Sequence, residues 1–293
     1  MSAQPATGPP ASSLVFIDEA EVPETFNVLL YGETGAGKST AAATAPGPIM
    51  WVNAEGRGAL AYPRKIARAL GTKIYEAPIP RGVSPRPILR EVIEHVRYGK
   101  EPIVKTVVVD TVAKVRDGLI RDMVTPGAKN TIQQFGDVAK VLEEFVVIMR
   151  DQPVNLILLC HEEVNDVEGE RIVQPLIGGA LTAKIPGDMD VMAYCGVTRD
   201  PETGDVRYLG QLVAGKGRRA KDRSGGIGQV QPLNLTLWLA TYRAALTVVD
   251  DSTQEGEPDN TETSEATPEQ EAQLESATDE FASEFTRPLE GDG

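Results

Sequence analysis

The sequence predicts an α/β domain in which a mostly parallel, twisted sheet is flanked by helices, with an antiparallel hairpin at one edge. Apolar, β-branched segments alternate along the chain with segments of helical spacing, and this alternation is typical of parallel strands joined by helices. A glycine-rich segment follows the first strand directly. Late in the chain, two strand-like segments flank the turn-like residues Asp200–Asp205, which predicts the hairpin.

Composition divides the chain into a flexible N-terminal arm (1–24), one folded domain (25–249) and an acidic tail (250–293). Residues 1–13 are rich in Pro, Ala, Ser and Gly and are expected to be disordered, and Leu14–Ile17 is a short apolar segment that could pair with another strand. The net charge is -14, and the tail, with fifteen acidic residues and one basic residue, holds all of it. The tail is therefore expected to be disordered, and residues 1–249 are neutral overall.

The strands are predicted from short apolar segments, each followed by a turn or a helical pattern. The first strand precedes the glycine-rich segment, and the third is strongly β-branched and ends in a carboxylate. The last two form the hairpin. In chain order they are Phe26–Tyr31, Ile49–Asn53, Ile103–Asp110, Val154–His161, Val191–Val197 and Val206–Val213.

The helices are predicted from apolar residues that repeat at helical spacing. Proline ends the first helix at Pro46, whereas Pro63 is awkward inside the second. The third places four apolar side chains, from Ile88 to Val96, on one face. In chain order the helices are Ser39–Ala45, Gly58–Leu70, Pro85–Tyr98, Thr131–Arg150 and Leu235–Ala245.

Cysteine usage and hydropathy indicate a soluble protein of the cytoplasm. Cys160 and Cys195 each lie in an apolar, strand-like segment, as expected for thiols packed in the core of a protein in a reducing compartment. The first residues lack the basic start and the apolar segment of a secretory signal. No apolar stretch approaches the length of a membrane span, so no membrane contact is expected.

A complete phosphate-binding loop carries the chemistry that the sequence predicts most firmly. The pattern G-x-x-x-x-G-K-[ST] is present between a buried strand and a helix, the context that it requires. Glycines let backbone N–H groups converge on phosphate oxygens, Lys38 can neutralise the β- and γ-phosphates, and Ser39 can bind Mg²⁺. ATP is the expected ligand. The residues expected to bind it are Gly32, Glu33, Thr34, Gly35, Ala36, Gly37, Lys38, Ser39 and Thr40.

Asp110 is the second predicted magnesium residue. It ends the strand Val107–Asp110, and a carboxylate there lies beside the loop in a P-loop sheet, where it can hold Mg²⁺ through water. An ordinary aspartate at the end of a strand is the alternative.

The base that activates water is expected to come from another strand, because Thr111 follows Asp110 where many P-loop ATPases have a glutamate. Glu55, just beyond the second strand, is the best candidate if that strand adjoins the P-loop strand. Glu162 and Glu163 are rivals, and an ordinary solvated glutamate is the alternative. His161, at the end of a buried strand, could sense the γ-phosphate or could be structural.

The segment Ala214–Arg223 concentrates basic residues in a body, residues 1–249, of zero net charge. It could be a solvated loop, a phosphate contact to DNA, or a finger inserted into a neighbouring subunit's ATP site. Its five basic residues are Lys216, Arg218, Arg219, Lys221 and Arg223.

In their order along the chain, these features resemble a RecA-type ATPase core. The segment Val107–Ala113 is similar to the second nucleotide motif of RecA. The pattern looks most like the small phage-encoded RecA-like single-strand annealing ATPases of the Sak-four group, over Phe26–Leu246. In that group, as here, the P-loop is followed by a strand with an acidic end at Glu55-Gly56, and a Lys221-Asp222-Arg223 triplet follows the hairpin.

The resemblance implies an ATPase, stimulated by DNA, that acts as a ring or filament of identical subunits on single-stranded DNA in recombination, annealing or repair. By that resemblance Glu55 would activate water, His161 would be the sensor, and Lys221 with Arg223 would reach into the adjacent subunit. The loop Glu162–Lys184 would face DNA, although the acidic residues in its first half would repel phosphate.

Two other functions remain open from the sequence. The first is a P-loop motor or loader that acts on protein partners in DNA packaging or replication. The second is a nucleotide switch with slow turnover and no nucleic acid. The acidic tail could restrain DNA binding, improve solubility or hook a protein partner through Phe281, Phe285 and Leu289, which are spaced four residues apart.

Overall fold

The computed structural model describes residues 22–167, 169–199, 203–215 and 217–247. The predictions for residues 1–13, 14–17 and 250–293 lie outside these ranges, as does Lys216 of the basic segment. Across the described residues, no helix is both long enough and apolar enough to cross a membrane.

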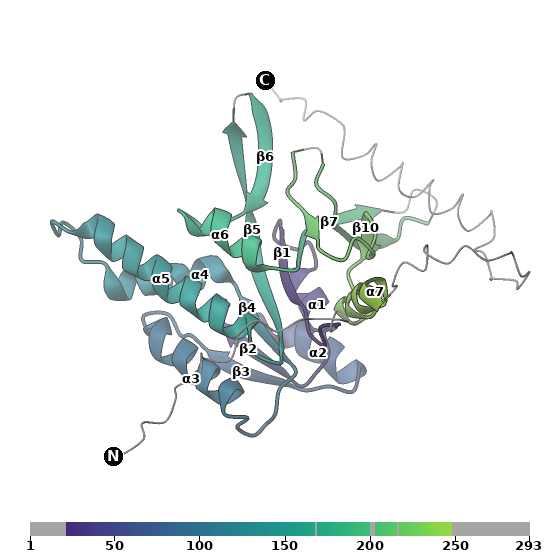
Figure 1. Ribbon diagram of the computed structural model, residues 1–293, viewed down its shortest axis with the longest axis horizontal. Helices are drawn as coiled ribbons and strands as arrows, with labels where there is room; N and C mark the ends of the chain where they lie inside the picture. Colours follow the sequence, from purple (N-terminus) through teal and green to yellow (C-terminus); the bar gives the residue numbers. More distant parts are fainter. Residues whose placement is uncertain (1–21, 168, 200–202, 216, 248–293) are drawn as a thin grey trace, which may run out of the picture.

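The described residues form a ten-stranded sheet with a parallel centre (Figure 1). Along the sheet the order is β10-β8-β7-β1-β5-β4-β2-β3, with β6 paired to β5 and β9 paired to β7. The six strands from β7 to β3 run parallel, and the other four pair antiparallel to their neighbours. The strands are β1 (Asn27–Gly32), β2 (Ile49–Asn53), β3 (Ile74–Pro78), β4 (Thr106–Asp110), β5 (Asn155–Val167), β6 (Glu170–Pro175), β7 (Val191–Arg199), β8 (Val206–Gln211), β9 (Lys221–Asp222) and β10 (Val230–Pro232).

Helices cover both faces of the sheet, which explains why the central strands are apolar along their whole length. In β1, Leu29 and Tyr31 pack into the core under α3, α4, α5 and α6, while Val28 and Leu30 pack under α1, α2 and α7 (Figure 1). The helices are α1 (Lys38–Ala42), α2 (Ala61–Ala69), α3 (Pro85–Arg97), α4 (Val112–Met123), α5 (Thr131–Arg150), α6 (Leu181–Asp188) and α7 (Leu235–Thr247).

This architecture confirms the predicted fold class, an α/β domain with a mostly parallel sheet flanked by helices and antiparallel strands at one edge. All six predicted strands and all five predicted helices are present, with shifts at their ends. Pro63 is the third residue of α2, where the backbone has no N–H partner to lose, so the helix accommodates it. Cys160 and Cys195 are both free and buried, as expected.

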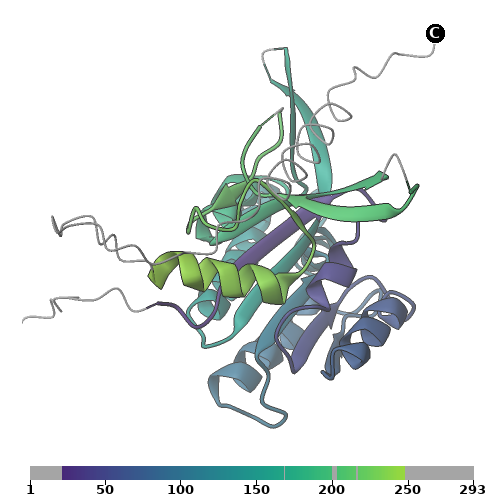
Figure 2. The ribbon, with the colours of Figure 1, turned by 90° about the vertical axis from the view of Figure 1, so that its right-hand side faces the viewer.

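The predicted loop Glu162–Lys184 is wrong. Strand β5 continues past His161 to Val167 and turns at Gly169 (φ +85°) into β6, and α6 follows. The two strands form a ribbon that rises above the sheet (Figure 2). A projecting two-stranded ribbon needs no apolar face on a core, so its acidic sequence carried no strand signal.

Four further elements were also not predicted. Strand β3 is short, lies at the edge of the sheet and is only partly buried, so its alternation is weak. Helix α4 begins directly after β4, and its charged residues dilute the apolar pattern. Strands β9 and β10 are two and three residues long, which is too short for a periodic pattern.

Candidate functional site

The predicted phosphate-binding loop connects β1 to α1 at the carboxyl edge of the parallel sheet. Gly32, Gly35 and Gly37 all have positive φ angles (+148°, +88° and +84°) that other residues rarely adopt. A Cβ at Gly32 would lie 2.4 Å from the carbonyl oxygen of Cys195, and a Cβ at Gly37 would lie 2.8 Å from the ring of Tyr208. Both glycines are therefore required by the packing of β7 and β8 against the loop.

Lys38 is folded back onto the loop that carries it. Its Nζ donates hydrogen bonds to the carbonyl oxygens of Gly32 (2.8 Å) and Glu33 (2.6 Å), and the residue is buried. Burial lowers the pKa of Lys38 from its ordinary value. When a nucleotide binds, phosphate oxygens would replace these two backbone carbonyl oxygens as the hydrogen-bond acceptors of the ammonium.

Ser39 in α1 and Asp110 at the end of β4 lie close together, although β5 separates β1 from β4. The Ser39 Oγ donates a hydrogen bond of 3.1 Å to Asp110 Oδ2. Asp110 is only 2% exposed, and burial raises its pKa to about 6; the bond from Ser39 opposes the rise and the charge of Glu55 adds to it. A hydroxyl and a buried carboxylate side by side are oxygen ligands of the kind that Mg²⁺ prefers, so these residues fit the predicted ion.

The expectation that β2, the strand before Glu55, adjoins the P-loop strand β1 is wrong. Strand β2 lies between β4 and β3, and two strands, β5 and β4, separate it from β1. Glu55 nevertheless reaches the site over the end of β4. Its Oε1 accepts a hydrogen bond of 3.1 Å from Thr111 Oγ1 and lies 3.8 Å from His161 Nε2, and its Oε2 pairs with Lys114.

The backbone around Glu55 is fixed by Asn53, the buried last residue of β2. The Asn53 side-chain oxygen accepts from the N–H groups of Glu55 (3.0 Å) and Gly56 (3.1 Å). Its amide nitrogen donates to Gly56 O (2.9 Å) and to Glu76 (2.8 Å). One side chain therefore determines where the chain turns after β2 and aims Glu55 at the carboxyl edge.

His161 lies beside the loop. The prediction that His161 ends its strand is wrong, because β5 continues for six more residues. It pairs in register with Gly32. Burial and the nearby charge of Lys38 lower the pKa of His161, so its imidazole is neutral near pH 7. A neutral ring between the P-loop and Glu55 can donate or accept one hydrogen bond.

The two rival bases occupy different environments. Glu163 accepts a hydrogen bond of 3.3 Å from Gln174 in the β5–β6 ribbon. Glu162 interacts with Lys38 and hydrogen-bonds Tyr194, whose pKa is raised to about 12 by burial and by this carboxylate. Glu162 is thus the rival that is electrostatically coupled to the P-loop.

The basic segment does not form one cluster. The guanidinium of Arg218 stacks 4.5 Å from the ring centre of Tyr194, near the carboxyl edge. Lys221 lies at the opposite edge and donates to the carbonyl oxygens of Pro186 (3.0 Å) and Gly187 (3.2 Å). Arg223 pairs there with Asp190 at 2.9 Å. The structure of one chain does not bring Lys221 and Arg223 to their own P-loop, and their action on a neighbour stays a prediction.

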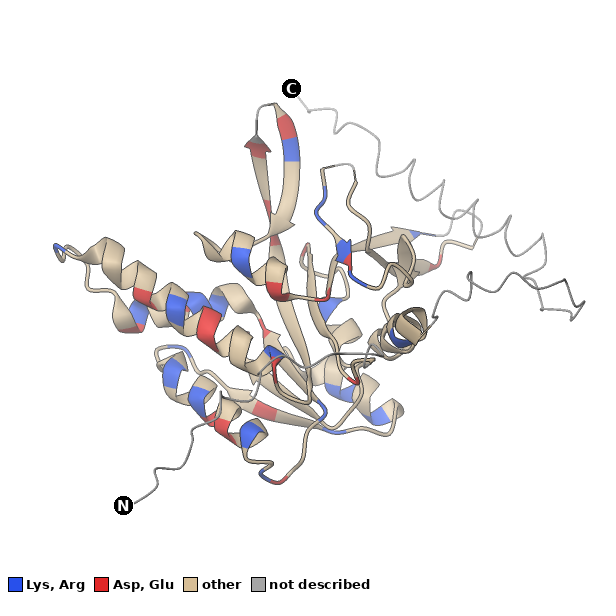
Figure 3. Cartoon of the chain, in the orientation of Figure 1, with Lys and Arg blue, Asp and Glu red and all other residues tan. Residues whose placement is uncertain are grey.

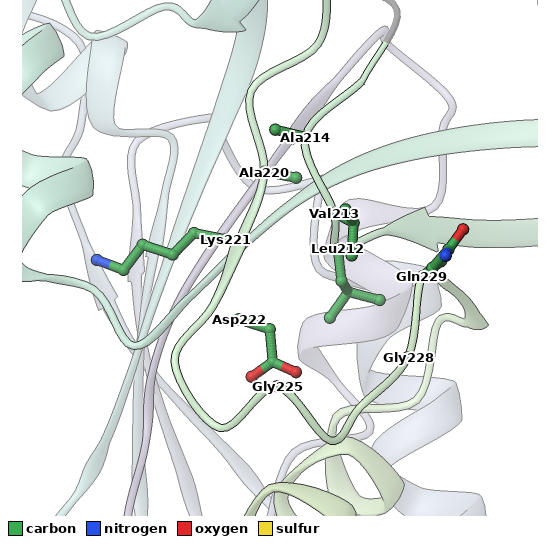
Figure 4. A pocket seen from close by; sticks show the side chains of 9 residues that line it. All are labelled: Leu212, Val213, Ala214, Ala220, Lys221, Asp222, Gly225, Gly228 and Gln229. Carbon is green, nitrogen blue, oxygen red and sulfur yellow. The ribbon is translucent and has the colours of Figure 1, made fainter.

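A cavity of about 460 Å³ opens beside Lys221 and Asp222. Figure 4 shows the Lys221 side chain extending away from the other lining side chains. The Asp222 carboxylate accepts hydrogen bonds from the N–H and hydroxyl of Ser224 and from the N–H of Ile227. No side chain of the predicted site lines this cavity other than Lys221.

Two contributors to the site were missed. Lys114 in the first turn of α4 and Tyr208 on β8 both touch predicted residues, Glu55 and Gly37 respectively. Lys114 follows Asp110 by four residues. If a helix had been predicted directly after the strand, this spacing would have placed Lys114 at the carboxyl edge. No sequence signal marks Tyr208, because its contact depends on the pairing of β8 with β7.

Comparisons with known proteins give one family match and a distant structural neighbour. A family model described as an AAA domain matches residues 24–224. No curated protein matches. Among solved structures, the chain is similar to a KaiC-like protein from the hyperthermophilic archaeon Pyrococcus horikoshii, with 14% identity, a TM-score of 0.33 and coverage of 64% of this chain and 77% of that chain.

Proposed function

The chain belongs to the AAA domain family of P-loop ATPases, and on that premise we propose that it hydrolyses ATP with Mg²⁺ and acts on single-stranded DNA in phage-type recombination, annealing or repair. The observation that carries the ATPase proposal is the meeting of Ser39 with Asp110 beside Lys38, with Glu55 at the end of a neighbouring strand.

Each side chain has a distinct role in this proposal. The N–H groups of the loop and Lys38 bind the β- and γ-phosphates, once Lys38 leaves the carbonyl oxygens of Gly32 and Glu33. Ser39 and Asp110 hold Mg²⁺, which neutralises phosphate charge. Glu55 orients the attacking water, and His161 lies where it can report on the γ-phosphate to the β5–β6 ribbon.

The DNA part of the proposal rests on the resemblance to Sak-four-type ATPases and on a basic edge of the β5–β6 ribbon. Gly217 and Arg219 form backbone hydrogen bonds with Val173, so the basic segment runs alongside β6. The exposed Arg171 and Arg219 therefore lie on two segments that run side by side. Figure 3 shows basic residues close to acidic ones on the ribbon. Phosphate contact is expected at these arginines and not at the acidic half of the ribbon.

A specific observation also favours the second candidate function, a motor or loader that acts on protein partners in DNA packaging or replication. The ribbon projects from the sheet, and its β5 strand is acidic, with Glu163 and Asp166, while Glu170 begins β6. A basic protein surface would complement this charge, whereas a DNA backbone would be repelled.

The test is an ATPase assay with and without single-stranded DNA, applied to the full chain and to Arg171→Ala/Arg219→Ala. Stimulation in the full chain that is weakened in the double variant supports the DNA proposal. ATPase activity that DNA leaves unchanged favours the protein-directed function. No ATP hydrolysis under any of these conditions refutes the proposed activity.

We also propose that the active form is a homo-oligomer, a ring or filament, in which Lys221 and Arg223 act on a neighbour's ATP. Fingers that act in trans stabilise the charge of the transition state. Mixing Lys38→Ala with Arg223→Ala subunits should then restore activity at mixed interfaces. No rescue at any mixing ratio would remove these two residues from the proposal.

A further inference from the structure

The carboxylate of Glu55 is engaged by two side chains from the start of α4. Thr111 donates a hydrogen bond of 3.1 Å to Oε1, and the Lys114 ammonium pairs with Oε2. The Glu55 side chain is 22% exposed and that of Lys114 is 46% exposed, so the pair lies at the rim of the site, open to solvent on the lysine side. Glu55 thus has both oxygens bound within its own chain.

Neither α4 residue serves its own helix. Thr111 is the N-cap residue, a position where threonine normally accepts a hydrogen bond from the following backbone, yet its side chain caps nothing and points to Glu55. Lys114 lies in the first turn, where the helix dipole disfavours a cation. The start of α4 therefore places a hydroxyl and an ammonium at Glu55 at some cost to the helix itself.

These contacts compete with the role that Glu55 has in the proposed function. A carboxylate that orients a water must offer that water a lone pair, and the Lys114 ammonium takes up one of the lone pairs of Oε2. Asn53 fixes only the backbone of Glu55. The direction of the Glu55 carboxylate is set by Thr111 on Oε1 and by Lys114 on Oε2.

We propose that Lys114 is a positioning residue that restrains Glu55 and keeps basal ATP hydrolysis low, and that an anion which draws Lys114 away releases the base. This inference rests on the proposed ATPase function and on Glu55 as its base. It assigns to Lys114 the regulation of that site and not a step of the chemistry.

The test compares the steady-state ATPase of the full chain with that of Lys114→Met, Lys114→Arg and the matched control Lys100→Met. Lys100 has a similar exposure of 50% and pairs with Glu94 at 3.7 Å, but it lies beyond the end of α3, outside the site. Lys114→Met should raise kcat about two- to fivefold, the size of effect that an exposed ion pair supports. Lys114→Arg keeps the cation and should keep the low rate, and Lys100→Met should not change it.

A second readout separates restraint from a structural role. The pair is partly exposed, so KCl should screen it, and the ratio of the Lys114→Met rate to the unmodified rate should fall toward one as salt rises. KM for ATP should stay the same, since Lys114 does not touch the P-loop residues. Loss of a purely structural contact would lower kcat, with no dependence of the ratio on salt.

The outcomes divide cleanly between the two proposals. If the unmodified chain hydrolyses ATP and Glu55→Gln stops it, yet Lys114→Met is unchanged or slower, the restraint is refuted and the ATPase proposal stands. If the unmodified chain hydrolyses ATP but Glu55→Gln does not lower the rate, the base lies elsewhere, and the restraint is refuted while the ATPase proposal stands. If the unmodified chain shows no ATP hydrolysis, the proposed function fails and the restraint fails with it. A faster Lys114→Met whose gain is lost in Glu55→Gln/Lys114→Met supports the restraint.

Discussion

Replacing Asp110 with asparagine should stabilise the protein in the absence of Mg²⁺ while it abolishes the magnesium site. Asp110 is buried at the end of β4, and its pKa is raised from 3.8 to about 6. Because the folded-state pKa lies above the unfolded one, ionisation favours the unfolded chain. The stabilising contribution of the protonated form is complete below about pH 4 and is lost as the pH rises through 6.

The magnitude follows from the size of the shift. Roughly two pKa units at about 1.4 kcal/mol each give a loss of about 3 kcal/mol in the unmodified chain at pH 8. Asparagine carries no charge and can still accept the hydrogen bond that Ser39 donates at 3.1 Å to Oδ2. Asp110→Asn should therefore unfold with a free energy higher by up to about 3 kcal/mol at pH 8, and by almost nothing near pH 4.

The assay is urea unfolding of both chains in EDTA, at several pH values from 4 to 8, followed by the same series with Mg²⁺ and a non-hydrolysable ATP analogue. The ligands should stabilise the unmodified chain and have a much smaller effect on Asp110→Asn. Two results would refute the view that the ionised, buried Asp110 destabilises the fold until a cation binds. One is an Asp110→Asn variant that is less stable than the unmodified chain at pH 8, and the other is a difference in unfolding free energy that does not change with pH.

Three further predictions test other parts of the site. Gly37→Ala should weaken ATP binding in calorimetry, because φ is +84° and the new Cβ would lie 2.8 Å from the Tyr208 ring, a strain of roughly 1–3 kcal/mol; normal affinity would show that the loop has more room. Glu55→Gln should keep ATP binding and lose about 10²–10⁴-fold in kcat, and if Glu162→Gln does so instead, Glu162 is the base. Truncation after Val249 should tighten single-stranded DNA binding at low salt, since the tail can occupy basic surface in cis; equal affinity across a salt series would leave the tail a solubilising segment or a protein hook.

Local features of this chain were predictable because they depend on residues close together in sequence. The P-loop is recognised from nine consecutive residues and the strand before them, and in the structure these nine run from the last residue of β1 to the third residue of α1. Asp110 follows from its position at the end of an apolar strand. Burial on both faces also leaves a local trace, since β1, β2 and β4 are apolar at every position but their ends.

Features that depend on which strands pair were not predictable. The path of Glu55 to the site runs over the end of β4, because β5 and β4 separate β2 from β1. The acidic segment after His161 forms a ribbon because β6 pairs with it across a tight turn. The basic segment is divided because Arg218 joins the β6 side while Lys221 pairs with β7 at the opposite edge. Spacing along the chain carries no information about these long-range pairs.

The most direct test of the central claim is Mg²⁺-dependent ATP hydrolysis by the full chain beside Lys38→Ala, with Lys100→Ala as the control for loss of a lysine. Lys38 is buried on the loop carbonyls and Lys100 lies far from the site, so circular dichroism should show the same fold in all three. The unmodified chain and the control should release phosphate at the same rate, and Lys38→Ala should release none above background. Equal turnover in Lys38→Ala would contradict the assignment of Gly32–Thr40 as the site of ATP hydrolysis.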